Sequence, residues 1–301
     1  MSRLQIQQQA CIAVPAFKDI CKTFIRKFGV AGKSNSCVQN YLRQISKLVL
    51  FYQKSPLDLT SEEVEEFLVY LRQNEPPSLS SFKHLVYGLR HLYGIYQRED
   101  MEVILPEVNH PKTLPEVFSK EEIHRLLCAP GYLKHRVLLA TIYDAGLRIS
   151  EATSLLISDL DFDRQVIHVR QSKFKKDRYV PVSTMLCRGV KKYIITCHPK
   201  DYLFNGRVKG QPMSVQGIRH IMHGAMKKCG ITKKACVHSL RHSYATHLLE
   251  DGLDLVTLKN QMGHARIENT MMYIHIARVS NTRGFSPLQT LYPDNNKKKN
   301  K

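Results

Sequence analysis

The sequence predicts a mainly α-helical protein of two domains, with a small β-sheet in the second. The length of 301 residues suggests two domains, at roughly 100–200 residues per domain. Apolar residues recur every three or four positions through most of the chain, which is the period of amphipathic helices. Alternation typical of strands occurs only between about 165 and 182. A proline-rich stretch at 104–117 separates the two regions and is predicted to be an extended linker.

The composition is that of an ordinary globular protein. Hydrophobic residues make up 43% and charged residues 24%, which excludes wholesale disorder. No apolar run approaches the ~20 residues that a membrane-spanning helix needs, and the segment from Met1 to Phe17 lacks the pattern of a secretory signal. The eight cysteines form no CxxC pair. We therefore expect reduced thiols, a cytoplasmic location and no membrane partner.

The first domain is predicted to span residues 15–103 and to be a bundle of four helices. Residues 1–14 are polar and glutamine-rich and are expected to be frayed. The first helix begins near Phe17 and keeps apolar residues on one face as far as Phe28. The other three are predicted from about Ser34 to Val49, from the capping box Thr60–Glu63 to Leu71, and from Leu79 to Gln97.

The second domain is predicted to span residues 118–293 and to combine helices with the sheet. It starts at the capping box Ser119–Glu122, and a buried helix from Arg136 ends at Gly146. Residues 159–164 have the composition of a turn. Two strands, 165–171 and 178–182, flank a basic turn at 172–177. Helices are expected at 150–156, 184–196, 214–229, 239–250, 254–261 and 268–279, and a disordered basic tail at 294–301.

The charge predicts a polyanionic partner. The formal net charge is +19, with 13 basic and 10 acidic residues in 1–105 against 32 and 16 in 106–301. Such a field attracts nucleic acid and speeds its capture. Candidate contacts with double-stranded DNA in the first domain, where a solvated helix face is nearly as good an explanation, are Lys22, Arg26, Lys33, Arg43, Lys83 and Arg90.

Three islands of polar residues in the second domain carry the chemistry. They are Asp144-Ala-Gly-Leu-Arg148-Ile-Ser-Glu151, then His238-Ser-Leu-Arg241-His242, and finally Met262-Gly-His264, which Tyr273 follows nine residues later. Their order, residue types and spacing resemble those of the tyrosine recombinase, or phage integrase, family, and of Xer-type or mobile-element integrases in particular. The resemblance covers about 15–285, because the first domain is similar to the family's helical, SAM-like core-binding domain.

The resemblance implies a site-specific DNA recombinase that cleaves and rejoins strands through a 3′-phosphotyrosyl intermediate, with no metal, ATP or other cofactor. Tyr273 would be the nucleophile, and Arg148 and Arg241 would clamp the scissile phosphate. His264 would donate a hydrogen bond to that phosphate. His238, one helical turn before Arg241, would be the acid/base partner of the tyrosine, and Glu151 resembles an acidic residue that orients the site.

A lysine in the basic turn is implied to protonate the leaving 5′-oxygen. Lys173 matches the family position. However, Phe174 replaces the usual glycine and further lysines crowd the turn, so Lys175 stays open as the alternative. Lys175, Lys176 and Arg178 are also candidate DNA contacts.

Elementary chemistry supports these roles. A phosphotyrosine ester is close in energy to the phosphodiester that it replaces, so a tyrosine nucleophile conserves bond energy. A phenol has a pKa near 10 and is normally protonated, so it needs help to attack. The negative charge that spreads over the non-bridging oxygens during phosphoryl transfer suits two guanidiniums, each a planar fork of permanent charge.

Simpler explanations exist for each residue alone. Arg148 could cap a helix, Arg241 could be a surface cation, His264 could belong to a turn, and Tyr273 could be a core residue. All four of these explanations would have to be true together, and the residues would still have to reproduce the ordered pattern of the family by accident. Zinc is a further alternative, but the spacing of its candidate ligands fits no zinc template, so no metal is expected. Those ligands are Cys229, Cys236, His242 and His247.

The competing functions are a type IB topoisomerase-like enzyme and an inactive DNA-binding regulator. The two-lobed pattern and the tail after Tyr273 favour recombination. A monomer in solution would then form a homotetramer on two DNA duplexes in a prokaryotic nucleoid, with the two domains closing around DNA. Segment 280–292 would pack on a neighbouring protomer, with packing on its own domain as the alternative.

Overall fold

The computed structural model describes residues 5–32, 34–102, 105–107, 114–170 and 177–277. The chain divides between Lys112 and Thr113 into two compact units, and the predicted class, mainly α with a small sheet, is confirmed. Lys33, Lys173, Lys175, Lys176, the segment 280–292 and the tail 294–301 lie outside the described residues.

The described residues of the first unit form helices joined by loops, and they have their own apolar core. The core is lined by one face of each long helix, including Phe17 and Phe24 from the second helix and Tyr93 from the fifth. The helices Asn35–Tyr52 and Leu79–Ile95 approach closely at Gly88, where a Cβ atom would lie 3.2 Å from Cβ of Tyr41. The helices are α1 (Ile6–Ala13), α2 (Phe17–Val30), α3 (Asn35–Tyr52), α4 (Ser61–Asn74), α5 (Leu79–Ile95) and α6 (Glu99–Glu102).

The prediction that residues 1–14 are frayed is wrong for the segment that forms α1. This helix packs against α3 and buries Ala10 completely, while Cys11 packs partly buried against the same core. Small residues let the helix lie close to its neighbour, although they give only a weak amphipathic signal. The first unit is therefore larger at its N-terminal end than the sequence pattern indicates.

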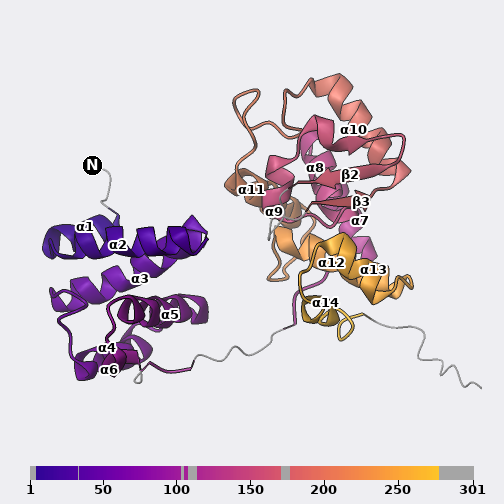
Figure 1. Ribbon diagram of the computed structural model, residues 1–301. Helices are drawn as coiled ribbons and strands as arrows, with labels where there is room; N and C mark the ends of the chain where they lie inside the picture. The colour runs from indigo at the N-terminus through magenta and orange to yellow at the C-terminus, as the bar shows by residue number, and fades with distance from the viewer. Residues whose placement is uncertain (1–4, 33, 103–104, 108–113, 171–176, 278–301) are drawn as a thin grey trace, which may run out of the picture. The chain divides into compact units, whose positions relative to one another are not determined.

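The second unit packs its helices around α8 and places a sheet at one side (Figure 1). α8 contacts α10 and α12 most extensively, and it also contacts α7 and α9. The helices are α7 (Lys120–Cys128), α8 (Leu133–Asp144), α9 (Ile149–Ser154), η1 (Ile157–Asp159, a 3₁₀ turn), α10 (Thr184–Cys197), α11 (Val215–Lys228), α12 (Val237–Glu250), α13 (Leu255–Met262) and α14 (Glu268–Met271).

The sheet of the described residues is antiparallel, with strand order β1-β2-β3. The strands are β1 (Leu160–Asp161), β2 (Val166–Val169) and β3 (Arg178–Pro181). Ile167 pairs with Val180, and both side chains are fully buried, which fixes the register of the inner face. β1 lies where the sequence predicts only a turn, because two residues are enough to pair with Val166 and Ile167.

The last described segment is less helical than predicted. A helix was expected over 268–279, whereas α14 ends at Met271. Beyond it, the backbone N–H groups of Tyr273, Ile274 and Ile276 donate to carbonyls three residues back, which is the bonding of tight turns. Separately, none of the helices in the described ranges is both long and apolar enough to cross a bilayer.

Candidate active site

Arg148 and Glu151 are placed by the sharp turn between α8 and α9. Gly146 makes this turn with a φ of +55°, and a Cβ atom there would lie 2.4 Å from the ring of Tyr244, so only glycine fits. Arg148 is the N-cap residue, directly before the first residue of α9. Glu151 reaches back to accept the backbone N–H of Arg148 at 2.8 Å, and one of its oxygens accepts Nη1 of Arg148 at 2.7 Å.

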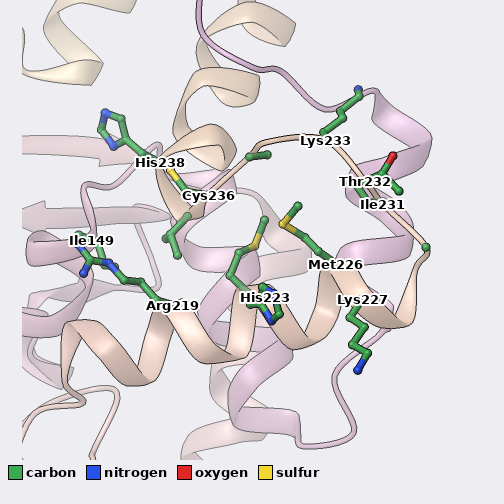
Figure 2. Close-up of a pocket in the computed structure, with 14 residues that line it drawn as sticks. Ile149, Arg219, His223, Met226, Lys227, Ile231, Thr232, Lys233, Cys236 and His238 are labelled. Carbon is green, nitrogen blue, oxygen red and sulfur yellow. The ribbon is translucent and has the colours of Figure 1, made fainter. Parts of the chain in front are cut away.

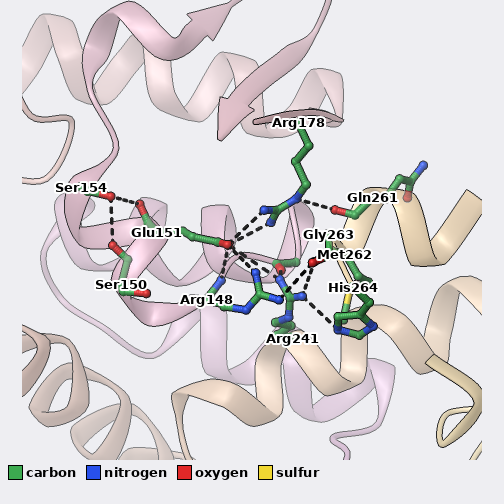
Figure 3. A network of polar contacts seen from close by, with 11 residues as sticks. Arg148, Ser150, Glu151, Ser154, Arg178, Arg241, Gln261, Met262, Gly263 and His264 are labelled. Atoms are coloured by element: carbon green, nitrogen blue, oxygen red, sulfur yellow. Dashed lines mark hydrogen bonds and ion pairs between the residues drawn. The ribbon is translucent and has the colours of Figure 1, made fainter. Parts of the chain in front are cut away.

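Glu151 is a buried carboxylate that three guanidiniums surround (Figure 3). Arg178 binds both of its oxygens, at 3.0 and 2.9 Å, and Nη1 of Arg241 lies 3.8 Å away. Burial alone would raise the pKa of Glu151. The hydrogen bonds and charge of Arg178, the Arg148 backbone and the charge of Arg241 outweigh it and lower that pKa to about 2. The carboxylate is therefore ionised and leaves the cluster with excess positive charge.

The same three arginines bind consecutive backbone carbonyls at the end of α13 (Figure 3). Arg178 Nε donates to the carbonyl of Gln261 at 2.8 Å, Arg241 Nη2 to that of Met262, and Arg148 Nη2 to that of Gly263 at 3.3 Å. The last carbonyls of a helix have no partner within it and carry partial negative charge. This helix end therefore stabilises the arginine cluster and links it to His264.

Arg241 is buried more deeply than Arg148. Its side chain on α12 is 1% exposed, against 20% for Arg148, and its Nη1 donates to the carbonyl of Gly146. Burial and the charge of Arg148 lower the pKa of Arg241, but an arginine is not deprotonated near neutral pH. Arg148 thus presents the more accessible guanidinium, and Arg241 supports it from inside the fold.

His264 is held in one orientation by two partners. Its Nε2 lies 3.2 Å from Nη2 of Arg241 and its Nδ1 2.9 Å from the hydroxyl of Thr270. Burial and the charges of Arg241, Arg148 and Arg178 lower its pKa to about 3. The ring is therefore neutral, and the network assigns Nε2 as the acceptor from Arg241.

Tyr273 is 2% exposed, and its hydroxyl contacts His242 rather than His238. Nδ1 of His242 lies 2.9 Å from the hydroxyl oxygen, and the ring of His264 is parallel to the tyrosine ring with centroids 6.4 Å apart. Burial raises the pKa of the phenol, and the charges of Arg241 and Arg148 oppose this. The sequence assigned His238 to this contact. In the structure the His238 ring packs edge-on against His242, with centroids 4.6 Å apart.

Sequence reasoning missed His242 as a partner of Tyr273 and considered it only for zinc. The signal was its position one helical turn after His238 and directly after Arg241, which places it beside the other site residues on α12. Burial, His238 and Arg241 lower its pKa to about 4. His242 is therefore neutral near pH 7, and its Nδ1 can accept the proton of the phenol.

Two family patterns match the chain, one in each unit. The Phage integrase family pattern matches residues 116–279, and the pattern described as Phage integrase, N-terminal SAM-like domain, matches residues 20–102. The chain belongs to the phage integrase family. The enzyme is accordingly a tyrosine-type site-specific recombinase, as the sequence predicted.

Relatives and solved structures agree with this assignment. The chain is 34% identical to the integrase/recombinase y4qK of Sinorhizobium fredii over 84% of its length and 82% of that protein. It is 31% identical to the tyrosine recombinase XerA of Thermococcus onnurineus, over 87% and 92%. The fold is similar to that of the XerH site-specific recombinase bound to palindromic difH substrate in a post-cleavage complex, with 21% identity, a TM-score of 0.66 and coverage of 84% and 78%.

Arg178 is not available to DNA in the way the sequence suggested. Its side chain is 8% exposed, because Glu151 and the end of α13 enclose it. Among the other candidate contacts of the recombinase, Arg26 and Arg43 are exposed and Lys83 is half-buried. Lys22 pairs with Asp19 at 2.9 Å, and Arg90 donates to the carbonyl of Leu105 at 3.2 Å.

The two histidines considered for zinc are engaged elsewhere. His247 lies 2.8 Å from the hydroxyl of Tyr143 and 3.0 Å from the carbonyl of Phe118, and His242 contacts Tyr273. Within the described residues, no group of three or more His, Cys, Asp or Glu side chains is arranged to hold a metal ion.

A pocket of about 820 Å³ adjoins the active site of the recombinase. Arg219 and His238 lie toward one side of it, and Lys227 and Lys233 toward the other (Figure 2). Its interior is apolar, with Met222 and Met226 from α11 and Val237 from α12. His238 is exposed and therefore links this basic rim to the histidine that contacts Tyr273.

The neutral histidines predict that the recombinase loses stability in mild acid. The folded-state pKa of His242, His247 and His264 is lowered, chiefly by burial, whereas an unfolded histidine titrates near 6.5. Below about pH 6.5 the unfolded chain therefore binds more protons than the folded one, and the free energy of unfolding falls as the pH falls. The melting temperature should be lower at pH 5 than at pH 7.5.

Two variants test whether the buried histidines cause this loss of stability in acid. His264→Gln should flatten the dependence of the melting temperature on pH. His220→Gln, an exposed position on α11, should leave it as in the wild type. Equal melting temperatures for the wild type at both pH values would contradict the prediction.

Proposed function

We propose that this tyrosine recombinase cleaves and rejoins double-stranded DNA with Tyr273 as the nucleophile. The observation that carries the proposal is the contact of the Tyr273 hydroxyl with a neutral histidine, in a site that also holds Arg148 and Arg241. A DNA partner is supported by the net charge of +19 and by the substrate-bound XerH recombinase that shares the fold. Lys22, Arg26, Arg43 and Lys83 remain proposed contacts with DNA phosphates.

The proposed step is a transesterification that balances without a co-reactant. Oη of Tyr273 forms a bond to phosphorus while the bond from phosphorus to the 5′-oxygen breaks, which leaves a 3′-phosphotyrosyl link and a free 5′-hydroxyl. The phenol proton passes to the pair of His238 and His242, and the leaving oxygen receives a proton from Lys173. The 5′-hydroxyl of another strand reverses the step and rejoins the DNA.

Arg148 and Arg241 stabilise the charge on the non-bridging oxygens of that phosphate. They are aligned before DNA arrives, by Glu151, by the carbonyl of Gly146 and by the carbonyls at the end of α13. Fixed donors aimed at developing charge are among the largest contributions to catalysis. His264 donates to the phosphate from Nε2 once the ring changes tautomer, so that its proton moves from Nδ1 to Nε2 and Nδ1 accepts from the Thr270 hydroxyl.

A covalent adduct tests the proposal. The purified recombinase is incubated with a target duplex that is nicked beside the cleavage point, so that the released strand diffuses away and the reaction stops at the intermediate. We expect an adduct that survives denaturant, and peptide mapping should locate the nucleotide on Tyr273. No adduct on any target, or an adduct on another residue, would overturn it. Efficient relaxation of a plasmid without target sites would favour the topoisomerase-like alternative.

Lys173 is proposed to be the acid for the leaving group, and a modified substrate tests it. Lys173→Ala should lower cleavage strongly, because a 5′-alkoxide is a poor leaving group without a proton. A substrate with sulfur as the bridging 5′ atom has a far better leaving group and should restore cleavage by this variant. Lys175→Ala is the matched control. If the sulfur substrate restores Lys175→Ala and not Lys173→Ala, the acid is Lys175.

The recombinase is further proposed to act as a homotetramer on two duplexes, with segment 280–292 packed on a neighbouring protomer. The apolar residues of this segment, Phe285, Leu288 and Leu291, support such packing. The mass of the complex on DNA, measured with and without residues 280–292, decides between exchange with a neighbour and packing on the segment's own domain.

A further inference from the structure

Arg178 uses its guanidinium entirely inside the protein. It is the first residue of β3, and its Nε donates to the carbonyl of Gln261 at 2.8 Å while its two Nη atoms bind the two oxygens of Glu151. A bidentate pair of this kind fixes direction as well as distance. Arg178 thus ties the sheet to α9 and to the end of α13, the two elements that hold Arg148 and His264.

The end of α13 is shaped to fit this side chain. Gly263 has a φ of +61°, and a Cβ atom there would lie 3.1 Å from both Cδ and Nη1 of Arg178. A side chain there would press on the Arg178 side chain, and the left-handed backbone of this turn itself favours glycine. The carbonyl of Gly263 in turn accepts Nη2 of Arg148, so the position of Arg178 is coupled to that of Arg148 through a single residue.

Glu151 provides a second connection. Its Oε1 accepts both Arg178 Nη1, at 3.0 Å, and Arg148 Nη1, at 2.7 Å. Without Arg178, the carboxylate would keep only Arg148 and the more distant Arg241 as charged partners. It would then be free to rotate and to draw Arg148 away from its present direction.

We propose that Arg178 is a positioning residue for DNA cleavage, which acts by holding Glu151 and the end of α13 so that Arg148 faces the scissile phosphate. This inference rests on the proposed function, because it requires Arg148 to bind that phosphate. It replaces the earlier expectation that Arg178 itself contacts DNA.

The first measurement is single-turnover cleavage of the nicked target together with DNA affinity. Arg178→Met should lower the cleavage rate on the order of 10²-fold, the loss that a misplacement of about 1 Å produces, while the affinity for DNA stays close to that of the wild type. Arg178→Lys should recover only part of the rate, because a lysine is a point charge without the fork. Arg164→Met is the control, since Arg164 lies over the exposed ring of Tyr179 near the same sheet.

A neutral scissile group separates positioning from a merely structural role. A methylphosphonate at the cleavage point carries no charge for Arg148 to stabilise. If Arg178 acts through Arg148, the difference in rate between Arg178→Met and the wild type should shrink on this substrate, as it should for Arg148→Met. A variant that is only less stable would lose the same factor on both substrates.

The outcomes are distinct. A wild-type rate for Arg178→Met, or an equal loss on charged and neutral substrates, would overturn the positioning role. Absence of any adduct with the wild type would instead overturn the proposed function. If Arg178→Met does not fold, Arg178→Lys keeps the buried charge and carries the same comparison between substrates.

Discussion

Replacing Tyr273 with phenylalanine is expected to abolish the covalent adduct and leave DNA binding unchanged. The substitution removes one oxygen from a ring that is 2% exposed and packed in a small apolar cluster with Leu258 and Met262, so the fold should persist. His242 Nδ1 loses its partner, at a cost of about 1 kcal/mol in stability. The measurement is the fraction of nicked DNA that remains attached to protein in denaturant, with affinity measured in parallel.

Tyr193→Phe is the matched control for this experiment. Tyr193 is also buried, and its hydroxyl donates to the carbonyl of Leu203 at 2.9 Å, away from the arginine cluster. It should lose a hydrogen bond of similar value and keep full adduct formation. An adduct with Tyr273→Phe would place the nucleophile on another residue and would remove the basis for the mechanism.

Replacing Arg148 with methionine is expected to lower the cleavage rate on the order of 10²–10³-fold, by analogy with the loss of a single hydrogen-bond donor to an oxyanion in other enzymes. Its side chain is the more accessible of the two proposed clamps, so it should contact the phosphate directly. DNA affinity should change little, because most of it comes from many phosphate contacts. Single-turnover cleavage and equilibrium binding are measured on the same target.

Arg136→Met provides the comparison for Arg148→Met. Arg136 lies on α8 and donates to the carbonyl of Gly131, toward the opposite end of that helix from Gly146. Its loss should leave the rate of cleavage as in the wild type. A fall in affinity as large as the fall in rate for Arg148→Met would show that Arg148 binds DNA in general rather than stabilising the reacting phosphate.

The part of the active site that could be predicted from the sequence consists of residues within short motifs. Arg148 and Glu151 share one helical start, and Arg241 lies on the helix that also carries His238, so local spacing already describes their arrangement. His242 follows the same local rule. It was not predicted because the resemblance to the family pointed to His238, the first histidine of α12, and gave no role to His242 one turn later.

The part that could not be predicted depends on contacts between distant segments. Arg178 follows a basic turn and therefore looks exposed in the sequence, whereas its burial requires Glu151, Gln261 and the missing side chain of Gly263 to meet in space. Likewise, α1 gains its helix by packing its small residues on α3. Neither the burial of Arg178 nor the formation of α1 is marked by a regular spacing of apolar residues in the sequence.

The acceptors at the end of α13 belong to the main chain, and this has a consequence for engineering the enzyme. A substitution at Gln261 leaves the carbonyl oxygen that receives Arg178 in place and removes only the bond from the Tyr244 hydroxyl to its side chain, so combinatorial libraries aimed at new target sequences can diversify this position. Met262 also offers its carbonyl to Arg241, but its side chain is buried in the apolar cluster around Tyr273 and should stay apolar. Gly146, where an added Cβ would collide with Tyr244, and Gly263, where it would press on Arg178 from a left-handed backbone, should be held constant in every such library.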